Sequence, residues 1–215
     1  MKTVQVYSIF YSIQGESTFA GFPCVFIRLA GCSARCGYCD SMDAVNSKGE
    51  CRTIDSIIEE VKQYGVNIVE VTGGEPLEQE NTPELLNKLL DAGHDVLLET
   101  NGMHTIKYVN DKVYIIMDIK TPGSKANGSF ENLNLHFAEK KGMDIKFVIT
   151  SKEDFDFAIK KSDEYDLFNQ CEVLISPVEG LNIKEVAKWV LDSKRRVRLQ
   201  LQQHKIIWPD SKEEC

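Results

Sequence analysis

The sequence predicts an α/β fold built on a parallel sheet, and three observations support this prediction. Short apolar runs rich in β-branched residues alternate along the 215-residue chain with segments that have a helical pattern. Most of these runs are continuous rather than alternating, as expected for parallel strands that are covered on both faces. The polar and reactive residues gather directly after the predicted strands, where parallel α/β barrels place their active sites.

Eight strands are predicted, at residues 4–8, 24–29, 68–72, 96–100, 113–117, 145–149, 172–176 and 197–201. The helices between them have recognisable ends. Thr82, followed by Pro83, is a predicted N-cap, and Ser151 and Asn182 each begin a spacing close to that of a capping box. Gly93 is a predicted C-cap.

The composition is that of an ordinary globular protein of one domain, with 42% hydrophobic and 27% charged residues. The net charge of −8 argues against a nucleic-acid partner or an anionic membrane surface, and residues 194–198 are interpreted as a solvated basic helix end. No apolar run has the length of a membrane span, and we expect no secretory signal. Seven cysteines in this composition favour a reducing cytoplasm. Residues 123–134 are expected to form a mobile loop, and residues 210–215 a frayed tail.

Cys32, Cys36 and Cys39 are the strongest chemical signal in the chain. Thiolates are soft ligands that select zinc or iron–sulfur clusters. A zinc site usually closes with a fourth Cys or His, but the nearest ones downstream are Cys51 and His94. A cubane held by three thiolates leaves one iron open to a cofactor or substrate. A structural zinc loop with a distant fourth ligand is the alternative.

Two further segments carry polar groups of chemical interest. In the segment at residues 72–76, Gly73 and Gly74 would let the backbone approach a ligand closely, and Glu75 could accept from an amine. A tight turn between strand and helix would explain the two glycines equally well. Gln14 and Glu16, before the strand at 24–29, present groups suited to a flat heterocycle, unless they simply occupy an edge hairpin.

The C-x3-C-x2-C spacing resembles that of the radical S-adenosylmethionine (SAM) enzymes, and Gly73-Gly74-Glu75 resembles their GGE motif. This resemblance implies a compact, partial (β/α)6 barrel with a short N-terminal hairpin extension. It also implies a 4Fe–4S cluster on Cys32, Cys36 and Cys39, whose fourth iron is chelated by SAM. The reduced cluster then cleaves SAM to a 5′-deoxyadenosyl radical.

Other motifs narrow the resemblance to the 7-carboxy-7-deazaguanine synthases of 7-deazapurine (queuosine and preQ0) biosynthesis: residues 10–17, 26–31, 39–41 and 200–205. The resemblance covers nearly the whole chain. It implies conversion of 6-carboxy-5,6,7,8-tetrahydropterin to 7-carboxy-7-deazaguanine by hydrogen abstraction at C6, ring contraction and loss of ammonia, with SAM regenerated. It further implies a homodimer and an electron donor such as flavodoxin or ferredoxin.

The resemblance also assigns roles by position. SAM contacts are expected from Tyr38, Gly74, Glu75, Asn101, Thr121, Gly123, Ser176, Pro177, Val178 and Glu179. Substrate contacts are expected from Ile13, Gln14, Gly15, Glu16, Arg28, Thr72, Thr100 and Gln202. Arg28 would pair with the substrate carboxylate, or else form a structural ion pair. His204 is the expected catalytic residue, which either transfers protons or only positions the pterin.

Ser41 departs from the family, which often has threonine directly after Cys-Asp. In the family this hydroxyl ligates Mg²⁺, and serine keeps the hydroxyl while losing the methyl group. The alternative is that Ser41 only caps the following helix. The predicted organisation is one radical SAM domain over residues 1–215: a substrate-binding segment at 1–23, the barrel at 24–205 and a tail at 206–215.

The cysteine loop is compatible with two other functions. A glycyl-radical-enzyme activase would use the same cysteine loop, and the segment at residues 117–120 is similar to the Asp-x-Lys element of such activases. Activases act on a protein backbone, so they need no Gln-Gly-Glu segment or late Gln/His set for a small heterocycle. A zinc-stabilised binding module is the non-enzymatic alternative.

Overall fold

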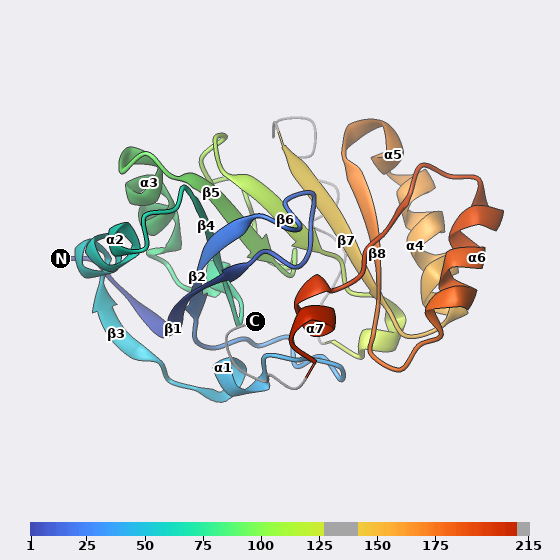
Figure 1. The fold of residues 1–215 in the computed structure, drawn as a ribbon, viewed down its shortest axis with the longest axis horizontal. Helices are drawn as coiled ribbons and strands as arrows, with labels where there is room; N and C mark the ends of the chain where they lie inside the picture. The colour runs from blue at the N-terminus through green and yellow to red at the C-terminus, as the bar shows by residue number, and fades with distance from the viewer. Residues whose placement is uncertain (127–141, 210–215) are drawn as a thin grey trace.

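The computed structural model describes residues 1–126 and 142–209. Within these ranges the strands form one nine-stranded sheet, in the order β3-β1-β2-β4-β5-β6-β7-β8-β9 (Figure 1). The strands are β1 Thr3–Ile13, β2 Pro23–Leu29, β3 Glu50–Thr53, β4 Ile68–Gly73, β5 Asp95–Thr100, β6 Tyr114–Asp118, β7 Met143–Ile149, β8 Glu172–Pro177 and β9 Arg198–Leu199. Strands β2 and β4 to β9 each pair in parallel with their neighbours in this order, while β1 pairs antiparallel with both β2 and β3.

The helices are α1 Met42–Asn46, α2 Ile54–Gln63, α3 Thr82–Asp91, α4 Lys152–Glu164, α5 Leu167–Gln170, α6 Ile183–Ser193 and α7 Gln203–Ile207, with 3-10 turns η1 Pro76–Glu78 and η2 Pro122–Ser124. The main apolar core joins buried residues of α2, α3, α4, α5 and α6 to the parallel strands. In Figure 1, α1 and α7 lie apart from those helices, at the bottom of the view. In the described part of the chain no helix has the length and apolarity needed to cross a membrane.

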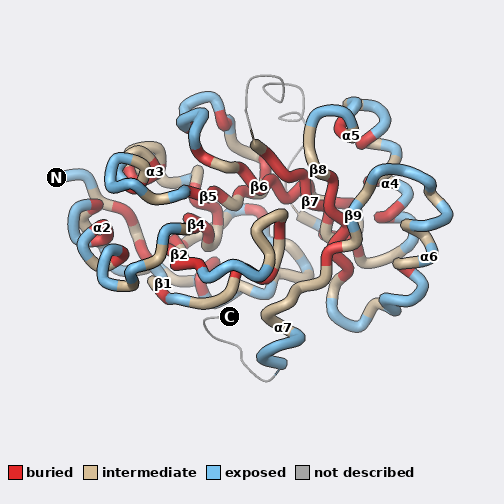
Figure 2. Tube along the Cα trace, turned by 45° about the horizontal axis from the view of Figure 1, so that its top comes forward, coloured by how far each residue is buried: buried red, intermediate tan, exposed pale blue. Residues whose placement is uncertain are grey.

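The two faces of the sheet differ in polarity because successive side chains of a strand point to opposite faces. In β7, Ile145 and Phe147 join the helix-covered core, whereas Asp144 and Lys146 face the other side. Figure 2 shows that the strands are buried along much of their length. The face turned away from the core helices therefore carries buried polar residues, among them Glu70, Thr72, Asp118 and Ser176.

The predicted fold class is confirmed. Seven strands, β2 and β4 to β9, form the parallel part of the sheet, and β1 forms an antiparallel hairpin with β2. The sheet is open, as a partial barrel requires. The strand predicted at 4–8 is too short, because β1 continues to Ile13 by pairing with β2 as far as Pro23. The strand predicted at 197–201 reduces to Arg198–Leu199, and β3 was not predicted.

Most predicted helix signals are also confirmed. The Ser151 hydroxyl accepts from Asp154 N, and the Asn182 side chain accepts from Lys184 N. Gly93 follows α3 with a φ of 92°, a left-handed conformation that favours glycine. The N-cap predicted at Thr82 is wrong, since Thr82 is the first residue of α3 and its hydroxyl donates to Pro76 O. The predicted mobile loop at 123–134 lies largely, and the tail at 210–215 entirely, outside the described residues.

Candidate active site

The three cysteines lie on the loop between β2 and α1, which we call the Cys loop (residues 30–41). Several bonds hold this loop in place. Gly31 N donates to Ala44 O at 2.9 Å, and Gly37 N donates to Ser124 O at 2.8 Å. The Ser33 amide and hydroxyl both donate to Glu78, at 2.9 and 2.6 Å. The loop is thus fastened to α1, η2 and η1 at once.

The thiols of Cys32, Cys36 and Cys39 are free and only partly buried. Burial raises the pKa of Cys36, and the neighbouring thiols of Cys39 and Cys32 raise it further, while Lys120 lowers it. Burial likewise raises the pKa of Cys39. Ligand thiols must lose their protons when they bind metal, so the three cysteines would hold the cluster as thiolates.

The segment Gly73–Glu75 begins where β4 ends, and it packs directly against the Cys loop. Gly74 N donates to Leu29 O at 2.9 Å, and Glu75 N donates to Gly31 O at 2.8 Å. A Cβ at Gly74 would overlap the Gly31 carbonyl. The close approach of the Gly74 backbone to the Gly31 backbone therefore explains why position 74 is a glycine. This agrees with the interpretation of the two glycines as a tight turn.

The Glu75 side chain is fully buried and holds the end of β5. It accepts from Leu77 N at 2.9 Å, from the Thr100 hydroxyl at 2.8 Å and from Asn101 N at 2.7 Å. Burial raises its pKa, against these hydrogen bonds, which lower it. Asn101 in turn places its amide 4.0 Å from the Cys32 sulfur. In this structure Glu75 thus positions Asn101 beside the Cys loop, and its carboxylate is enclosed by protein groups.

Residues predicted to bind substrate meet across the whole length of the sequence. Gln203 N donates to Gly15 O at 2.9 Å, and the Gln202 amide donates to Glu16 at 2.6 Å. A Cβ at Gly15 would overlap the His204 ring, so α7 packs directly against the turn after β1. The predicted neighbours Gly15, Glu16, Gln202 and His204 are therefore brought together.

The amide of Gln14 is engaged inside the protein. Its nitrogen donates to Glu70, and its oxygen accepts from Glu16 N at 2.8 Å. Burial lowers the pKa of His204, and Lys205 lowers it further, while Glu16 opposes this. The His204 imidazole is accordingly neutral at neutral pH.

Arg28 and Ser41 are in contact at the other side of this region. The Arg28 guanidinium donates to the Ser41 hydroxyl at 3.1 Å and lies 5.5 Å from the centre of the Phe10 ring. The Ser41 hydroxyl donates to Asp40 at 3.2 Å. Ser41 occupies the N-cap position of α1 but its side chain makes no capping bond. Among the described residues Arg28 has no carboxylate within ion-pair distance, so the structural ion-pair alternative is not observed.

The residues expected to contact the adenosyl part of SAM lie after β6 and β8. The Thr121 hydroxyl donates to Val148 O at 2.9 Å, and Gly123 N donates to Asp154 at 2.8 Å. Ser176 and Pro177 are buried at the end of β8, and Glu179 is exposed beyond it. The segment at 121–123 is next to the Cys loop through the bond from Gly37 to Ser124, whereas no such bond ties residues 176–179 to the loop in the described ranges.

Sequence reasoning did not predict three charged strand residues, Lys146, Glu99 and Asp118, as parts of the site. Lys146 of β7 donates to Glu16 at 2.8 Å and also to Glu99 of β5, and Asp118 of β6 lies 4.0 Å away. Asp118 also pairs with Lys120 at 2.8 Å, and Thr72 donates to Glu99 at 2.8 Å. The available signal was a charged residue within an otherwise apolar parallel strand. Because successive side chains of a strand point to opposite faces, such a residue indicates a sheet face that is turned away from the helices.

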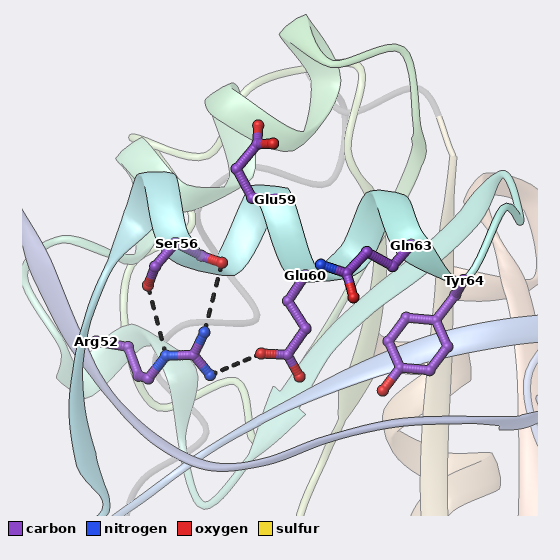
Figure 3. A pocket seen from close by; sticks show the side chains of 6 residues that line it. All are labelled: Arg52, Ser56, Glu59, Glu60, Gln63 and Tyr64. Carbon is purple, nitrogen blue, oxygen red and sulfur yellow. Dashed lines mark hydrogen bonds and ion pairs between the residues drawn. The ribbon is translucent and has the colours of Figure 1, made fainter.

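A surface pocket on β3 and α2 is lined by Arg52, Ser56, Glu59, Glu60, Gln63 and Tyr64 (Figure 3). Its arginine is already engaged, with Glu60 at 2.9 Å and Ser56 at 3.4 Å. None of the residues predicted to act in catalysis or binding lines it.

The sequence profile of the radical SAM superfamily matches residues 26–190. The chain is 41% identical over 213 residues to the 7-carboxy-7-deazaguanine synthase of Chlorobaculum tepidum, covering 97% of this chain and 96% of that one. It is 38% identical to the enzyme of the same name from Clostridium acetobutylicum, covering 94% and 95% of the two chains.

The chain belongs to the 7-carboxy-7-deazaguanine synthase family of radical SAM enzymes. Its fold agrees, since the crystal structure of QueE from Escherichia coli superposes with a TM-score of 0.74 over 94% of this chain and 95% of that one, at 19% identity. The protein is therefore an enzyme. A crystal structure of Streptococcus suis SuiB bound to S-adenosylmethionine also resembles it, with a TM-score of 0.60 over 80% of this chain and 48% of that one.

Membership of the radical SAM superfamily implies a 4Fe–4S cluster and SAM as cofactors. The donor set fits the cluster, because three neighbouring soft thiols lie on one fastened loop. In the described residues no three Cys, His, Asp or Glu side chains are gathered for a single metal ion.

Proposed function

We propose that this enzyme converts 6-carboxy-5,6,7,8-tetrahydropterin to 7-carboxy-7-deazaguanine, with ring contraction and loss of ammonia, in 7-deazapurine (queuosine and preQ0) biosynthesis. The observation that carries the proposal is the contact of residues 14–16 with residues 202–204, beside the polar interior. Through this contact, hydrogen-bonding groups of residues 14–16 and 202–204 form a wall beside the polar face of the sheet. The 7-carboxy-7-deazaguanine synthase of Chlorobaculum tepidum aligns with 97% of this chain, which includes both segments and the sheet between them. This alignment supports the proposed choice of substrate.

When bound, the cluster and SAM supply the radical that abstracts hydrogen from C6 of the pterin. Cys32, Cys36 and Cys39 would hold the cluster, and the Cys loop with the ends of β4, β5, β6 and β8 would hold SAM. The remaining steps require the chain to orient the pterin and to exchange protons with it. The residues proposed for this come from β1, β2 and α7.

Each of these residues has a distinct task in the proposal. Arg28 presents a guanidinium with no carboxylate partner in the described chain, so it is available to a substrate carboxylate, whose two oxygens fit its planar fork. Glu16 is an acceptor for N–H groups of the pterin edge. His204 is neutral at neutral pH, so its ring can both donate and accept a hydrogen bond to the substrate.

Mg²⁺ assistance is a finer part of the proposal. The chain offers the Ser41 hydroxyl and the neighbouring Asp40 carboxylate. Mg²⁺ keeps several waters and few protein ligands, so oxygens of the substrate would have to complete the site. Arg28 already donates to Ser41, and this bond would shift toward the substrate carboxylate when the pterin binds.

The test is anaerobic turnover of purified enzyme with the carboxytetrahydropterin, SAM and a reductant, with and without Mg²⁺. We expect a deazaguanine chromophore, more of it with Mg²⁺, and a Mg²⁺ requirement that Ser41→Ala weakens and Ser41→Thr preserves. No product, together with installation of a radical on a partner protein, would instead identify an activase. Colourless protein with stoichiometric zinc would contradict both enzymes.

Further parts of the proposal concern the cellular setting. The enzyme is proposed to act in the cytoplasm as a homodimer that receives electrons from a flavodoxin or ferredoxin, and to comprise one domain whose residues 1–23 serve substrate binding. Sedimentation of the holoenzyme tests the dimer, and turnover with each reduced donor in place of a chemical reductant tests the electron source.

A further inference from the structure

Lys146 is a buried cation in the polar interior to which no role has been assigned. It lies in the middle of β7, and its side chain is only 5% exposed. Because Ile145 and Phe147 on either side of it belong to the helix-covered core, Lys146 points to the opposite face. A buried ammonium is strongly unfavourable unless carboxylates compensate for the lost water.

Carboxylates from three separate segments surround this cation. Glu16, from the turn after β1, accepts at 2.8 Å, and Glu99 at the end of β5 is also hydrogen-bonded to it. Asp118 of β6 lies 4.0 Å away, where Lys120 pairs with it. Lys146 therefore links the turn after β1 to β5 and β6.

These neighbours fix the charge of Lys146. Burial lowers its pKa, but the carboxylates of Glu16, Glu99 and Asp118 together raise the pKa well above the ordinary value. Lys146 thus keeps its proton at neutral pH, which excludes it as a general base. Burial would raise the pKa of Glu99, but Lys146 and the bond from Thr72 bring the pKa below its ordinary value, so Glu99 is ionised.

Both carboxylates are held from two sides. Glu16 accepts from Lys146 through one oxygen and from Gln202 through the other, at 2.6 Å. Glu99 accepts from Lys146 through one oxygen and from Thr72 through the other, at 2.8 Å. Each carboxylate oxygen has a further lone pair, so the two fixed groups can still accept from a ligand.

We infer that Lys146 is a positioning residue, which holds Glu16 and Glu99 beside each other as a pair of acceptors for the N–H groups of the pterin. This inference rests on the proposed function, because the amino group and ring N–H groups of the pterin supply the donors. A single cation bonded to both carboxylates keeps them close in spite of their like charge. The arrangement is set before the substrate arrives, so little orientation remains to be lost on binding.

The test is Lys146→Met, which keeps an unbranched side chain one atom shorter and removes the charge. We expect KM for the carboxytetrahydropterin to rise about tenfold or more, because two substrate acceptors lose their common anchor. Cluster content and the change in the cluster's EPR spectrum on adding SAM should match the wild type. A purely structural role would instead lower cluster content, SAM binding and turnover together. Lys152→Met, which removes an exposed lysine–aspartate pair on α4, is the matched control and should change none of these quantities.

The possible results separate the inference from the proposed function. A folded Lys146→Met enzyme with wild-type KM overturns the inference alone. If this variant does not fold, the double variant Lys146→Met with Glu99→Gln also removes one of the carboxylates that lose their cation. A wild-type KM in that double variant also overturns the inference. Wild-type enzyme that makes no product from this pterin overturns the proposed function and the inference with it.

Discussion

Single residues in this protein act mainly by fixing backbone positions around the cysteines. Gly74 is the clearest case, since the space a side chain would need is taken by the Gly31 carbonyl. Glu75 works in the same region, where it accepts from one hydroxyl and two backbone amides. The GGE motif therefore has a structural task in this chain, in addition to the proposed contact with SAM.

We predict that Gly74→Ala destabilises the protein by about 3 kcal/mol, because neither the Gly31 backbone nor the end of β4 can move freely away from the added methyl group. The same displacement should reduce the iron bound per chain. Urea unfolding and iron analysis under anaerobic conditions measure the two effects. Gly37→Ala is the matched control in the same loop, since its Cβ would lie 3.6 Å from Ser124 O, an ordinary contact. Equal stability of the two variants would contradict the prediction.

At the scale of elements, the Cys loop is held by its neighbours and the metal is not its only support. Its backbone and the Ser33 side chain are bonded to α1, η1 and η2, and Gly74 and Glu75 donate to residues at its start. The loop thus has backbone and side-chain supports in addition to a cluster. This contrasts with small zinc domains, which fold only when the metal binds.

We expect Cys36→Ala to abolish cluster assembly and SAM cleavage while the protein keeps most of its fold, because other bonds retain the loop. Visible absorbance, reductive SAM cleavage and circular dichroism report the three properties. Cys51→Ala removes an exposed thiol in β3 and should leave all of them unchanged. Retained SAM cleavage in Cys36→Ala would rule out the ligand assignment.

The elements also show what sequence reasoning can reach. Strands such as β4 and β8 were predicted within a residue or two, because continuous apolar runs between turn signals have few alternatives. The edge strands β3 and β9, and β1 beside β3, were misjudged, since their exposed faces weaken the apolar pattern. The three cysteines were recognised by their spacing, and the resemblance to radical SAM enzymes, rather than the spacing alone, assigned them to a cluster. Lys146 was not recognised, because its partners are distant in sequence and only the folded sheet brings them together.

At the scale of the whole molecule, the two ends of the chain build one wall. Residues 14–16 and 202–204 meet through a backbone bond, a partly buried side-chain bond and the close packing of Gly15 against His204. Lys205 also reaches Asp40, at 2.9 Å, but these side chains are 36% and 56% exposed. An exposed ion pair contributes little, so packing at Gly15 holds α7 in place.

We therefore predict that Lys205→Ala changes the free energy of unfolding by less than about 1 kcal/mol, with an effect that salt suppresses. Gly15→Ala should displace α7 and raise KM for the pterin several-fold, while SAM cleavage in the absence of substrate persists. Urea unfolding at low and high salt and steady-state kinetics distinguish the two. A larger loss of stability in Lys205→Ala than in Gly15→Ala would reverse this ranking of forces.

The contact between residues 14–16 and residues 202–204 has a consequence for the synthesis of the enzyme. On the ribosome, the turn after β1 emerges well before its partner in α7, because 186 residues separate Glu16 from Gln202. A nascent chain can thus present its cysteines to the iron–sulfur assembly machinery long before it can recognise a pterin. A chain interrupted before α7 would carry the three cysteines but lack this wall of the proposed substrate site.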